Sequence, residues 1–528
     1  MLFNSYPFIF IYLPVVFAGT FLIGRHSHRL AAIWMGLASL CFYAVWNPRF
    51  VLLLLASIVF NYAVALSIDA QSKKSDRGHP KLVLVSALAA NLALLGYYKY
   101  ANFFLDSSNQ IFGWHLPIIS VVLPLGISFF TFTQIAFLVD VYRGVAREYS
   151  FINYLLFVTY FPHLIAGPVL HHRQMMPQFA NPDSYKINPE NVAVGLTIFV
   201  LGLAKKVLVA DTLAKGAGPI FAAANAGVPL TFFEAWTGAL TYTLQLYFDF
   251  SGYCDMAVGI SLLFNVKLPI NFDSPYKATS VIDFWRRWHM TLSAFLRDYL
   301  YIPLGGSRNC STSRRYANLM ITMLLGGLWH GAGWTFVMWG GLHGAYLIVN
   351  HGWRALAPRL AIRGPSKCGQ LASVGLTFVA VVVGWVFFRA ENFRTAWDML
   401  EGMAGLHGVS LPAWLNEHLS GVVSPTLYSS LRFDGFMPSV SISFPVIAML
   451  LFGFAIVWAF PNLQRLLERY NSGEDALTAL VPKFMKREVL PFHANTTVLA
   501  AISSAILFFV VALTIATHGS SEFLYFEF

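Results

Sequence analysis

A histidine surrounded by glycines inside a long apolar run is the residue best suited to chemistry in this chain. His330 lies in the apolar segment 317–349, with four glycines within four positions of it. Gly327 and Gly331 form a G-x-x-x-G pair, which lets another backbone approach closely. Burial favours the neutral, proton-accepting form of imidazole. His330 is therefore a candidate general base for moving an acyl group from a thioester to a hydroxyl. The alternative is a buried histidine that only hydrogen-bonds a neighbouring helix.

The segment 283–299 carries the densest group of basic and aromatic residues. Read as one helix, it places four polar residues on a single face, because they are three or four positions apart. One interpretation is an amphipathic helix that lies on the membrane with its basic face among the lipid headgroups. We favour a helix whose polar face lines a cavity, because Trp-Arg-Arg-Trp-His packs more large amphipathic groups than anchoring requires. The four residues are Arg286, His289, Ser293 and Arg297.

Signatures of several other chemistries do not occur in the sequence. Di-iron membrane enzymes repeat H-x-x-H-H and H-x-x-x-H spacings, and neither occurs here. The D-x-D motif of nucleotide-sugar enzymes and the phosphate-binding loop of nucleotide-driven transporters are also missing. The four cysteines have no metal-binding spacing. We therefore expect no metal site and no bound cofactor. The histidines weighed as metal ligands, besides His289 and His330, are His163, His171, His172 and His343.

The elements that position these residues must lie in a membrane. Of the 528 residues, 57% are hydrophobic and only 11% are charged, whereas soluble domains carry about 25% charged residues. This composition excludes an ordinary cytosolic enzyme, a disordered chain, a coiled coil and a transmembrane β-barrel. The net charge is +10. In a membrane protein such an excess of Lys and Arg usually lies in the cytoplasmic loops, so we expect no nucleic-acid partner. The sequence predicts an all-α polytopic protein embedded in the lipid bilayer.

Apolar runs long enough to cross a bilayer recur along the chain, and we expect ten or eleven spans in one membrane domain, 1–528. N-terminal spans would fill 1–240, a core segment with re-entrant parts 241–350, and C-terminal spans 351–528. The core segment concentrates ionisable groups at membrane depth, where each costs about 2.5–3.5 kcal/mol, so function is expected there. The predicted spans are 7–23, 30–46, 50–68, 81–98, 117–139, 151–170, 191–210, 371–388, 443–460 and 496–516.

Basic residues fall on alternate sides of the first helices. Arg25 and Arg29 follow the first span, and a second basic group follows the third. The positive-inside rule then places the loop 70–81 in the cytoplasm, and Asn47 and the N-terminus outside. We expect a bacterial inner-membrane protein with its N-terminus in the periplasm. The second basic group is Lys73, Lys74, Arg77 and Lys81.

Several motifs in chain order resemble the membrane-bound O-acyltransferase family, over about residues 1–390. The core of the resemblance is Trp329-His330-Gly331 in an apolar helix, preceded by DFWRRWH at 283–289. The bacterial branch with the alginate O-acetylation membrane proteins looks most similar. That branch also holds teichoic acid D-alanyl transfer proteins and cellulose-acetylation relatives. The other matching stretches are PLGISFFTF at 124–132, YFPHLIAGP at 160–168, YFDFSGY at 247–253 and YIPLGG at 301–306.

The resemblance implies an all-helical membrane enzyme with a funnel or tunnel through its core. His330 would be the catalytic histidine, and His289 a second histidine nearer the cytoplasmic mouth. The enzyme would take acetyl from acetyl-CoA in the cytoplasm and pass it across the membrane. There a periplasmic partner resembling SGNH hydrolases would esterify an exported polysaccharide such as alginate. Cellulose or teichoic acid is the alternative acceptor.

We expect the side chains around both histidines to bind the donor and the substrate. Basic residues would hold the CoA phosphates by charge-assisted hydrogen bonds, and Trp329 and Trp334 would keep water from the thioester. His289 could bind the donor, orient His330 or act in a proton relay. The rival function is a transporter or flippase that uses intramembrane His and Asp, which the lack of an inverted repeat disfavours. The expected binding residues are Arg286, Arg287, Trp288, Trp329, Trp334, Asp249 and Ser293, with Arg308, Arg314 and Arg315 as further basic candidates.

Overall fold

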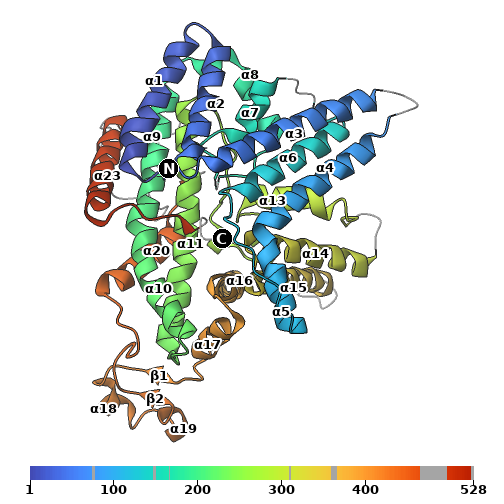
Figure 1. Cartoon of the computed structure of the whole chain (residues 1–528). Helices are drawn as coiled ribbons and strands as arrows, with labels where there is room; N and C mark the ends of the chain where they lie inside the picture. Colours follow the sequence, from blue (N-terminus) through green and yellow to red (C-terminus); the bar gives the residue numbers. More distant parts are fainter. Residues whose placement is uncertain are drawn as a thin grey trace.

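The computed structural model describes residues 1–73, 78–146, 150–165, 167–307, 311–357, 366–463 and 496–524, with only the backbone for 496–500. Within these residues the regular structure is almost wholly helical, with only two short strands, as the sequence predicts (Figure 1). Six stretches are long and apolar enough to cross a membrane, and two shorter helices are also apolar. The six are Pro7–Gly24, Arg49–Ser72, Pro80–Phe112, Pro189–Asn225, Lys367–Arg389 and Ala501–His518.

Several of these stretches contain more than one element. The elements are η1 (Pro7–Tyr12) and α1 (Leu13–Gly24); α3 (Arg49–Ser72); α4 (Pro80–Leu95), η2 (Gly96–Tyr100) and α5 (Ala101–Phe112); α9 (Pro189–Ala204), η4 (Lys205–Ala210) and α10 (Asp211–Asn225); α16 (Lys367–Arg389); and α23 (Thr496–His518). The two shorter apolar helices are α6 (Ile127–Tyr142) and α20 (Phe444–Ala459).

A buried helix, α11 (Phe232–Leu263), lies at the centre of the bundle. A capping box formed by Thr231 and Glu234 sets where it begins. The helix packs along α9 and α10. Small residues let two backbones touch there, because a Cβ on Gly202 would lie 2.7 Å from the backbone oxygen of Gly252. Residues on all sides of α11 are buried, which explains why its sequence has no polar stripe.

A second group of helices packs beside this core (Figure 1). It contains α3, α4 and α6, each in contact with the other two. Buried Asn61 and Asn91 join α3 to α4, because each side-chain amide donates to the oxygen of the other, at 3.1 and 2.7 Å. α2 (His28–Ala44) packs against α1 and α7 (Phe151–Thr159). The second group brings η2 and the start of α6 to the candidate site.

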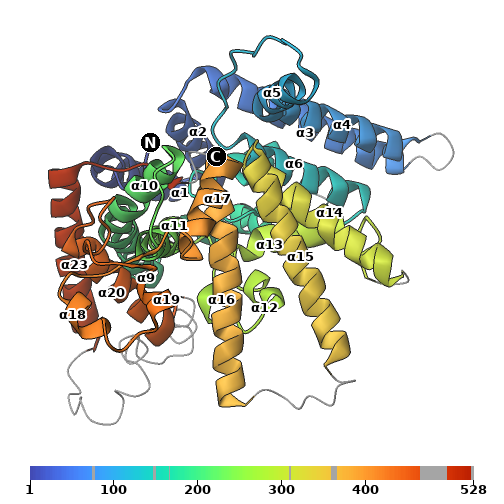
Figure 2. The same cartoon turned by 90° about the horizontal axis from the view of Figure 1, so that it is seen from below.

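The segment with His330 forms two closely packed helices. α14 (Thr312–His330) ends at the histidine, and α15 (Trp334–Leu356) begins after three residues. A Cβ on Gly327 would lie 2.2 Å from the backbone oxygen of Phe336. The close approach predicted from the G-x-x-x-G pair is therefore confirmed at Gly327. α15 also packs on α16, which in turn contacts α11 (Figure 2).

The helix predicted over 283–299 is interrupted. The chain forms α12 (Val281–Trp285), turns at 286–289, and resumes as α13 (Met290–Leu296) and η6 (Arg297–Tyr301). Two bonds to a preceding segment replace helical bonds at the break. The backbone N–H of Met290 donates to the backbone oxygen of Asn271 at 3.0 Å. The backbone N–H of Asp273 donates to the backbone oxygen of Arg287 at 2.9 Å. The prediction of one continuous helix with a single polar face is therefore wrong.

Two predicted spans are shorter than expected. The helix within 117–139 begins only at Ile127, because prolines and glycines in 113–126 keep that chain out of a helix. The helix within 151–170 stops at Thr159, shortly before a proline. The described residues thus hold six long and two shorter apolar helices, against the ten or eleven spans expected.

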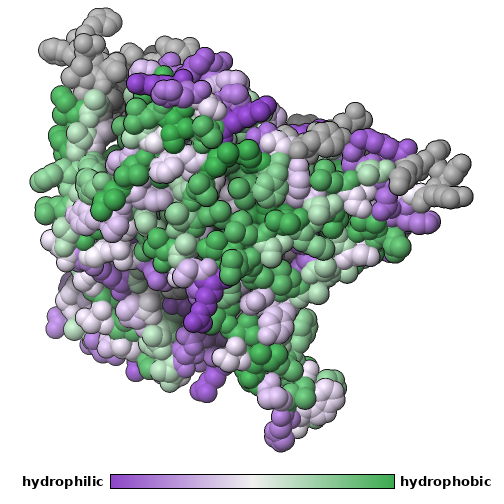
Figure 3. All heavy atoms as spheres, turned by 45° about the horizontal axis from the view of Figure 1, so that its top comes forward, coloured by the Kyte–Doolittle hydropathy of each residue, from purple (hydrophilic) through white to green (hydrophobic). Residues whose placement is uncertain are grey.

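Short elements complete the described chain. β1 (Val409–Ser410) pairs in parallel with β2 (Leu431–Arg432). On the face drawn in Figure 3, hydrophobic residues cover much of the middle and hydrophilic residues gather toward the ends, as expected of a surface in a membrane. The remaining elements are α8 (His172–Ala180), η3 (Pro182–Tyr185), η5 (Pro275–Lys277), α17 (Phe393–Met403), α18 (Leu415–Leu419) and α19 (Pro425–Tyr428).

Candidate active site

The ring of His330 lies among aromatic side chains at the end of α14. His330 is buried, and the ring centroids of Trp339 and Phe388 lie 5.1 and 5.2 Å from that of its imidazole, both edge-on. The helix ends here as the backbone of Gly331 becomes extended. Trp329 is also buried, with its ring centroid 4.9 Å from that of His330. The aromatic rings leave little room for water around the imidazole.

A lysine closes the end of α14. Lys99, in η2, donates from Nζ to the backbone oxygens of Trp329 at 2.6 Å and His330 at 3.2 Å, and to Ser128 Oγ at 3.4 Å. The last carbonyls of a helix have no partner within it, and a cation beside them is favourable. Lys99 is not among the residues expected from the sequence. Its place inside the apolar stretch Pro80–Phe112 is a signal that could have found it, because ionisable groups at membrane depth are costly.

His289 occupies the break between α12 and α13. Its φ is 43°, in the left-handed region, and it is fully buried. Nδ1 lies 3.1 Å from Asn271 Oδ1, which also accepts the backbone N–H of Thr291 at 3.2 Å. Because a backbone N–H can only donate, this atom of Asn271 is the amide oxygen, and the nitrogen of His289 facing it carries the proton. Nε2 is then the acceptor atom of the neutral ring.

The two histidines lie near two cavities. Their ring centroids are 6.3 Å apart. His330 lines a cavity of about 350 Å³, together with Trp46, Lys99 and Glu522. Asn271, which holds His289, lines a smaller cavity of about 20 Å³. The larger volume falls in the range of small-molecule sites, and the smaller one has room for about one water.

A third buried histidine, His343 in α15, belongs to the same aromatic cluster. Trp285 donates from Nε1 to its Nδ1 at 3.2 Å, and the ring centroid of Trp339 lies 4.9 Å from that of His343. Trp288, expected to bind donor or substrate, packs in this cluster 4.9 Å from Trp385, centroid to centroid. From the sequence, His343 is a candidate only as a metal ligand, and the fold brings it to the site.

Two of the expected site residues have partners other than the imidazoles. Trp334 is 48% exposed and donates from Nε1 to Ser107 Oγ in α5 at 3.0 Å, so it does not keep water from the histidines. The turn between α14 and α15 directs the side chain of Trp334 toward α5. Trp339, and not Trp334, packs against the imidazole of His330. Ser293 is half-buried in α13, where its Oγ donates to the backbone oxygen of Trp288 at 3.4 Å.

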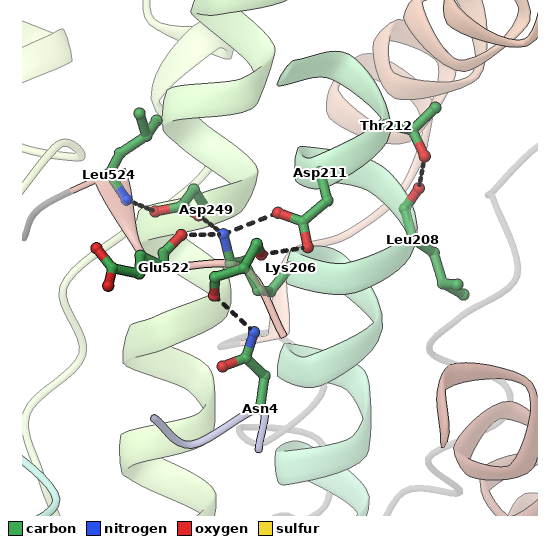
Figure 4. A network of polar contacts seen from close by, with 9 residues as sticks. Asn4, Lys206, Leu208, Asp211, Thr212, Asp249, Glu522 and Leu524 are labelled. Carbon is green, nitrogen blue, oxygen red and sulfur yellow. Dashed lines mark hydrogen bonds and ion pairs between the residues drawn. The ribbon is translucent and has the colours of Figure 1, made fainter. Parts of the chain in front are cut away.

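Asp249 holds the C-terminal segment of the described chain (Figure 4). Its Oδ1 pairs with Lys206 Nζ at 2.6 Å, and its Oδ2 accepts the backbone N–H of Leu524 at 3.0 Å. Lys206 also contacts Asp211 Oδ1 and the backbone oxygen of Glu522, both at 2.8 Å. These contacts give Asp249 a structural role in place of the expected substrate binding, because both of its oxygens are already engaged.

Two of the arginines expected to bind the donor already have partners. Arg287 donates from Nε to Asp283 Oδ1 at 2.9 Å, four residues earlier. Arg315 contacts Nδ1 of His351 through a guanidinium nitrogen at 2.5 Å. Their guanidinium groups are therefore less available to a phosphate than the sequence suggests.

The other basic candidates are more open. Arg286 is exposed, in the turn between α12 and α13, and makes no ion pair with a described residue. Arg314 is also exposed, and its Nη2 lies 3.4 Å from the backbone oxygen of Leu304. Arg308 lies outside the described residues. Among the basic candidates without an ion pair in the described structure, Arg286 is thus the one nearest to His289 in sequence.

Comparison with known families identifies the chain. Residues 52–390 match the family described as MBOAT, membrane-bound O-acyltransferase family. This range contains both central histidines, Lys99 and Asn271. The chain belongs to the membrane-bound O-acyltransferase family. The resemblance stated from the sequence motifs is confirmed, and so is the prediction of an O-acyltransferase.

Relatives of this O-acyltransferase match most of its length. A peptidoglycan O-acetyltransferase from Helicobacter pylori is 46% identical over 438 residues, 78% of this chain and 81% of the relative. A probable alginate O-acetylase from Pseudomonas aeruginosa is 44% identical over 443 residues, 82% of this chain and 81% of the relative. Another from Azotobacter vinelandii is 38% identical over 534 aligned positions that cover 100% of both chains. These relatives are transferases and give no support to the transporter alternative.

Proposed function

We propose that this O-acyltransferase moves acetyl groups from acetyl-CoA in the cytoplasm to a hydroxyl on the outer side of the membrane, for O-acetylation of an exported polysaccharide. The relatives named for O-acetylation of peptidoglycan and of alginate support acetyl as the acyl group. Their names differ in the polymer, so two acceptor classes have to be tested against each other. Alginate is the acceptor we favour, because several relatives are named for it.

The observation that carries this proposal is the position of His330. Its imidazole is buried among aromatic rings, yet the residue borders a cavity of about 350 Å³. A hydroxyl that enters this cavity would come beside His330, whose ring is packed against Trp329, Trp339 and Phe388. A general base needs to reach the proton that it removes, and a thioester needs protection from hydrolysis. The position of His330 meets both needs.

In the proposed reaction, His330 takes the proton of the acceptor hydroxyl as the oxygen attacks the acetyl carbonyl carbon. A C–O bond forms and the carbonyl becomes a tetrahedral intermediate. The intermediate then breaks its C–S bond to CoA, and the sulfur leaves with the proton that His330 received. The products are an acetyl ester and the CoA thiol, and the imidazole returns to its neutral form.

We assign His289 a positioning role or a role in a proton relay, in place of direct donor binding. Asn271 fixes its tautomer and orientation through the 3.1 Å contact, and the residue is fully buried. Its ring lies 6.3 Å from that of His330 and 6.2 Å from that of Trp329, centroid to centroid. From this place it can influence the orientation and the proton affinity of His330.

We place the acceptor and the donor at opposite ends of the site. The cavity beside His330 is lined by Met1 and Trp46, next to the position 47 that the charge pattern puts outside. The acceptor would therefore come from the periplasm, carried by a polysaccharide or by an SGNH-hydrolase-like partner. The donor would dock from the cytoplasm near Arg286, whose exposed guanidinium can meet the CoA phosphates.

Purified protein in liposomes, given acetyl-CoA with labelled acetyl, tests the proposal. Label should move to added alginate oligosaccharides, in the presence of the partner protein from the same cell, with one CoA thiol released per ester formed. If label moves to peptidoglycan fragments and not to alginate, the acceptor is peptidoglycan, the second acceptor class. CoA release that no hydroxyl acceptor stimulates, or no turnover of acetyl-CoA by folded protein, would contradict the proposal.

A further inference from the structure

Three side chains of types that can bind metals, from two segments of the chain, meet outside the candidate active site. Asp140 lies near the end of α6, His171 directly precedes α8, and His172 is its first residue. His171 Nε2 is 2.9 Å from Asp140 Oδ2, and His172 Nδ1 is 3.2 Å from the same oxygen. One ligand atom from each of the three residues lies within 4.8 Å of the other two. Asp140 and His172 are buried, and His171 is half-buried.

Hydrogen bonding alone does not satisfy this cluster. Asp140 Oδ2 also accepts from the hydroxyl of Tyr299 at 2.6 Å, so three donors approach one oxygen. A carboxylate oxygen accepts about two hydrogen bonds well. His172 is only 6% exposed; its Nδ1 faces Asp140 Oδ2 at 3.2 Å without good hydrogen-bond geometry, and its Nε2 has no hydrogen-bond partner among the described residues. A buried polar atom without a partner costs about 1–3 kcal/mol. A bound cation would satisfy the ring nitrogen that faces Asp140.

The spacing of the ligand atoms fits a coordination sphere. Zn²⁺ binds imidazole nitrogen and carboxylate oxygen at about 2.0–2.2 Å, which at tetrahedral angles places neighbouring ligand atoms about 3.4 Å apart. The separations of 2.9 and 3.2 Å from Asp140 Oδ2 are slightly shorter, so the ligand atoms would move apart by a few tenths of an ångström around the ion. Two imidazoles and one carboxylate suit first-row divalent metals rather than Mg²⁺ or Ca²⁺. We propose that Asp140, His171 and His172 bind one divalent transition metal ion, with Zn²⁺ as the best match.

Neighbouring groups support the ligands. Arg143 approaches the other carboxylate oxygen of Asp140, Oδ1, at 4.0 Å, which leaves Oδ2 for the metal. Tyr299 orients the carboxylate from η6, as the outer partners of metal ligands do. Metal binding through His171 Nε2 leaves the ring proton on Nδ1. A protonated Nδ1 cannot accept, so metal binding would break the 3.3 Å bond that Nδ1 accepts from the backbone N–H of Arg173.

The role of this ion is structural. It would tie α6 to His171, two residues after Val169, and to His172, the first residue of α8. The backbone N–H of Val169 donates to Thr291 Oγ1 at 3.0 Å, and Thr291 Oγ1 donates to Asn271 Oδ1 at 2.9 Å. Asn271 in turn holds His289. The metal would thus stabilise the segment that supports His289, without touching the reacting atoms. No metal site is expected from the repeated histidine spacings of known metal enzymes, because here two adjacent histidines meet a carboxylate from another helix.

Metal content of the purified full-length protein tests the inference independently of acetyl transfer. Wild type, loaded with Zn²⁺ and desalted, should retain about one ion per chain by elemental mass spectrometry. His172→Ala should lose it, and Tyr299→Phe should bind about 10–100-fold more weakly. His115→Ala, a change at an exposed histidine, is the matched control and should retain the ion.

Cobalt provides a second readout that needs no variant. Wild type loaded with Co²⁺ should show the visible absorption of a low-coordinate nitrogen and oxygen site. Wild type that neither retains Zn²⁺ nor gives this spectrum would overturn the inference. Equal metal content in wild type and in folded His172→Ala would overturn it as well, because the ion would then lie elsewhere. Failure of acetyl transfer alone leaves these readouts unaffected, so it bears only on the proposed function.

Discussion

Lys99 Nζ donates to the backbone oxygen of His330 at 3.2 Å, across 231 positions of the chain. Lys99 Nζ also donates to the backbone oxygen of Trp329, and the two bonds together hold the end of the helix that carries the proposed base. Lys99→Met keeps the length of the side chain and removes its charge and its donors. We expect kcat for acetyl transfer to fall about 100-fold, because small misplacements of a catalytic group have costs of this size.

The KM for acetyl-CoA should change little in Lys99→Met, because the lysine contacts the helix end. Lys215→Met, at an exposed lysine of α10, is the control and should keep full activity. Steady-state kinetics on both variants in liposomes check the prediction. A kcat for Lys99→Met equal to that of the control would show that the helix end holds His330 without the ammonium.

Asn271 is expected to matter through the orientation of His289. Asn271→Ala removes the acceptor of Nδ1 and leaves a buried ring nitrogen without its partner, at a cost of about 1–3 kcal/mol. Activity should fall about tenfold to a hundredfold. Thr291→Val is a graded comparison, because it removes the 2.9 Å hydroxyl bond to Asn271 and the acceptor of the Val169 N–H, and leaves the contact between Asn271 and His289 in place. Equal rates in the two variants would argue against an orienting role for Asn271.

The buried pair of Lys206 and Asp249 predicts a stability effect. Lys206→Met leaves the carboxylate of Asp249 buried without its cation, which typically costs about 3–5 kcal/mol. Thermal unfolding in detergent should therefore shift to clearly lower temperature. Lys186→Met is the matched control, because its pair with Asp183 is exposed and such pairs contribute about 0–1 kcal/mol. Similar Tm values for both variants would mean that the C-terminal segment is not held by this pair.

Arg286 is expected to act on the donor alone. Arg286→Gln should raise the KM for acetyl-CoA, since a charged hydrogen bond contributes about 1.5–3 kcal/mol. It should also flatten the dependence of KM on salt. Arg287→Gln, whose guanidinium is paired with Asp283, should change KM less. If neither variant alters KM or its salt dependence, the donor docks away from this turn.

The membrane fold and the central histidine could be predicted from sequence because both depend on local features. The composition alone indicates that the chain lies in a lipid bilayer. The glycines around His330 lie where α14 ends and α15 begins. The break at His289 could not be predicted. It depends on backbone bonds to Asn271 and Asp273, which spacing along 283–299 does not record.

The neighbours of the histidines were the hardest to predict. Trp334 stands close to His330 in sequence and faces away, whereas Lys99 is distant in sequence and contacts the same helix end. His343 reaches the site because α15 folds back along α14. Such contacts arise from the packing of whole helices, and a single sequence shows the helices but not which of their faces meet.

The most direct test of the account is the acetyl transfer rate of His330→Ala in folded, membrane-inserted protein. His418→Ala, at an exposed histidine of α18, serves as the matched control. Loss of a general base typically lowers a rate about 10²–10⁴-fold. We therefore predict a loss of this size for His330→Ala, with unchanged Tm, and full activity for His418→Ala. Acetyl transfer by His330→Ala at the rate of the control would contradict the assignment of His330 as the base.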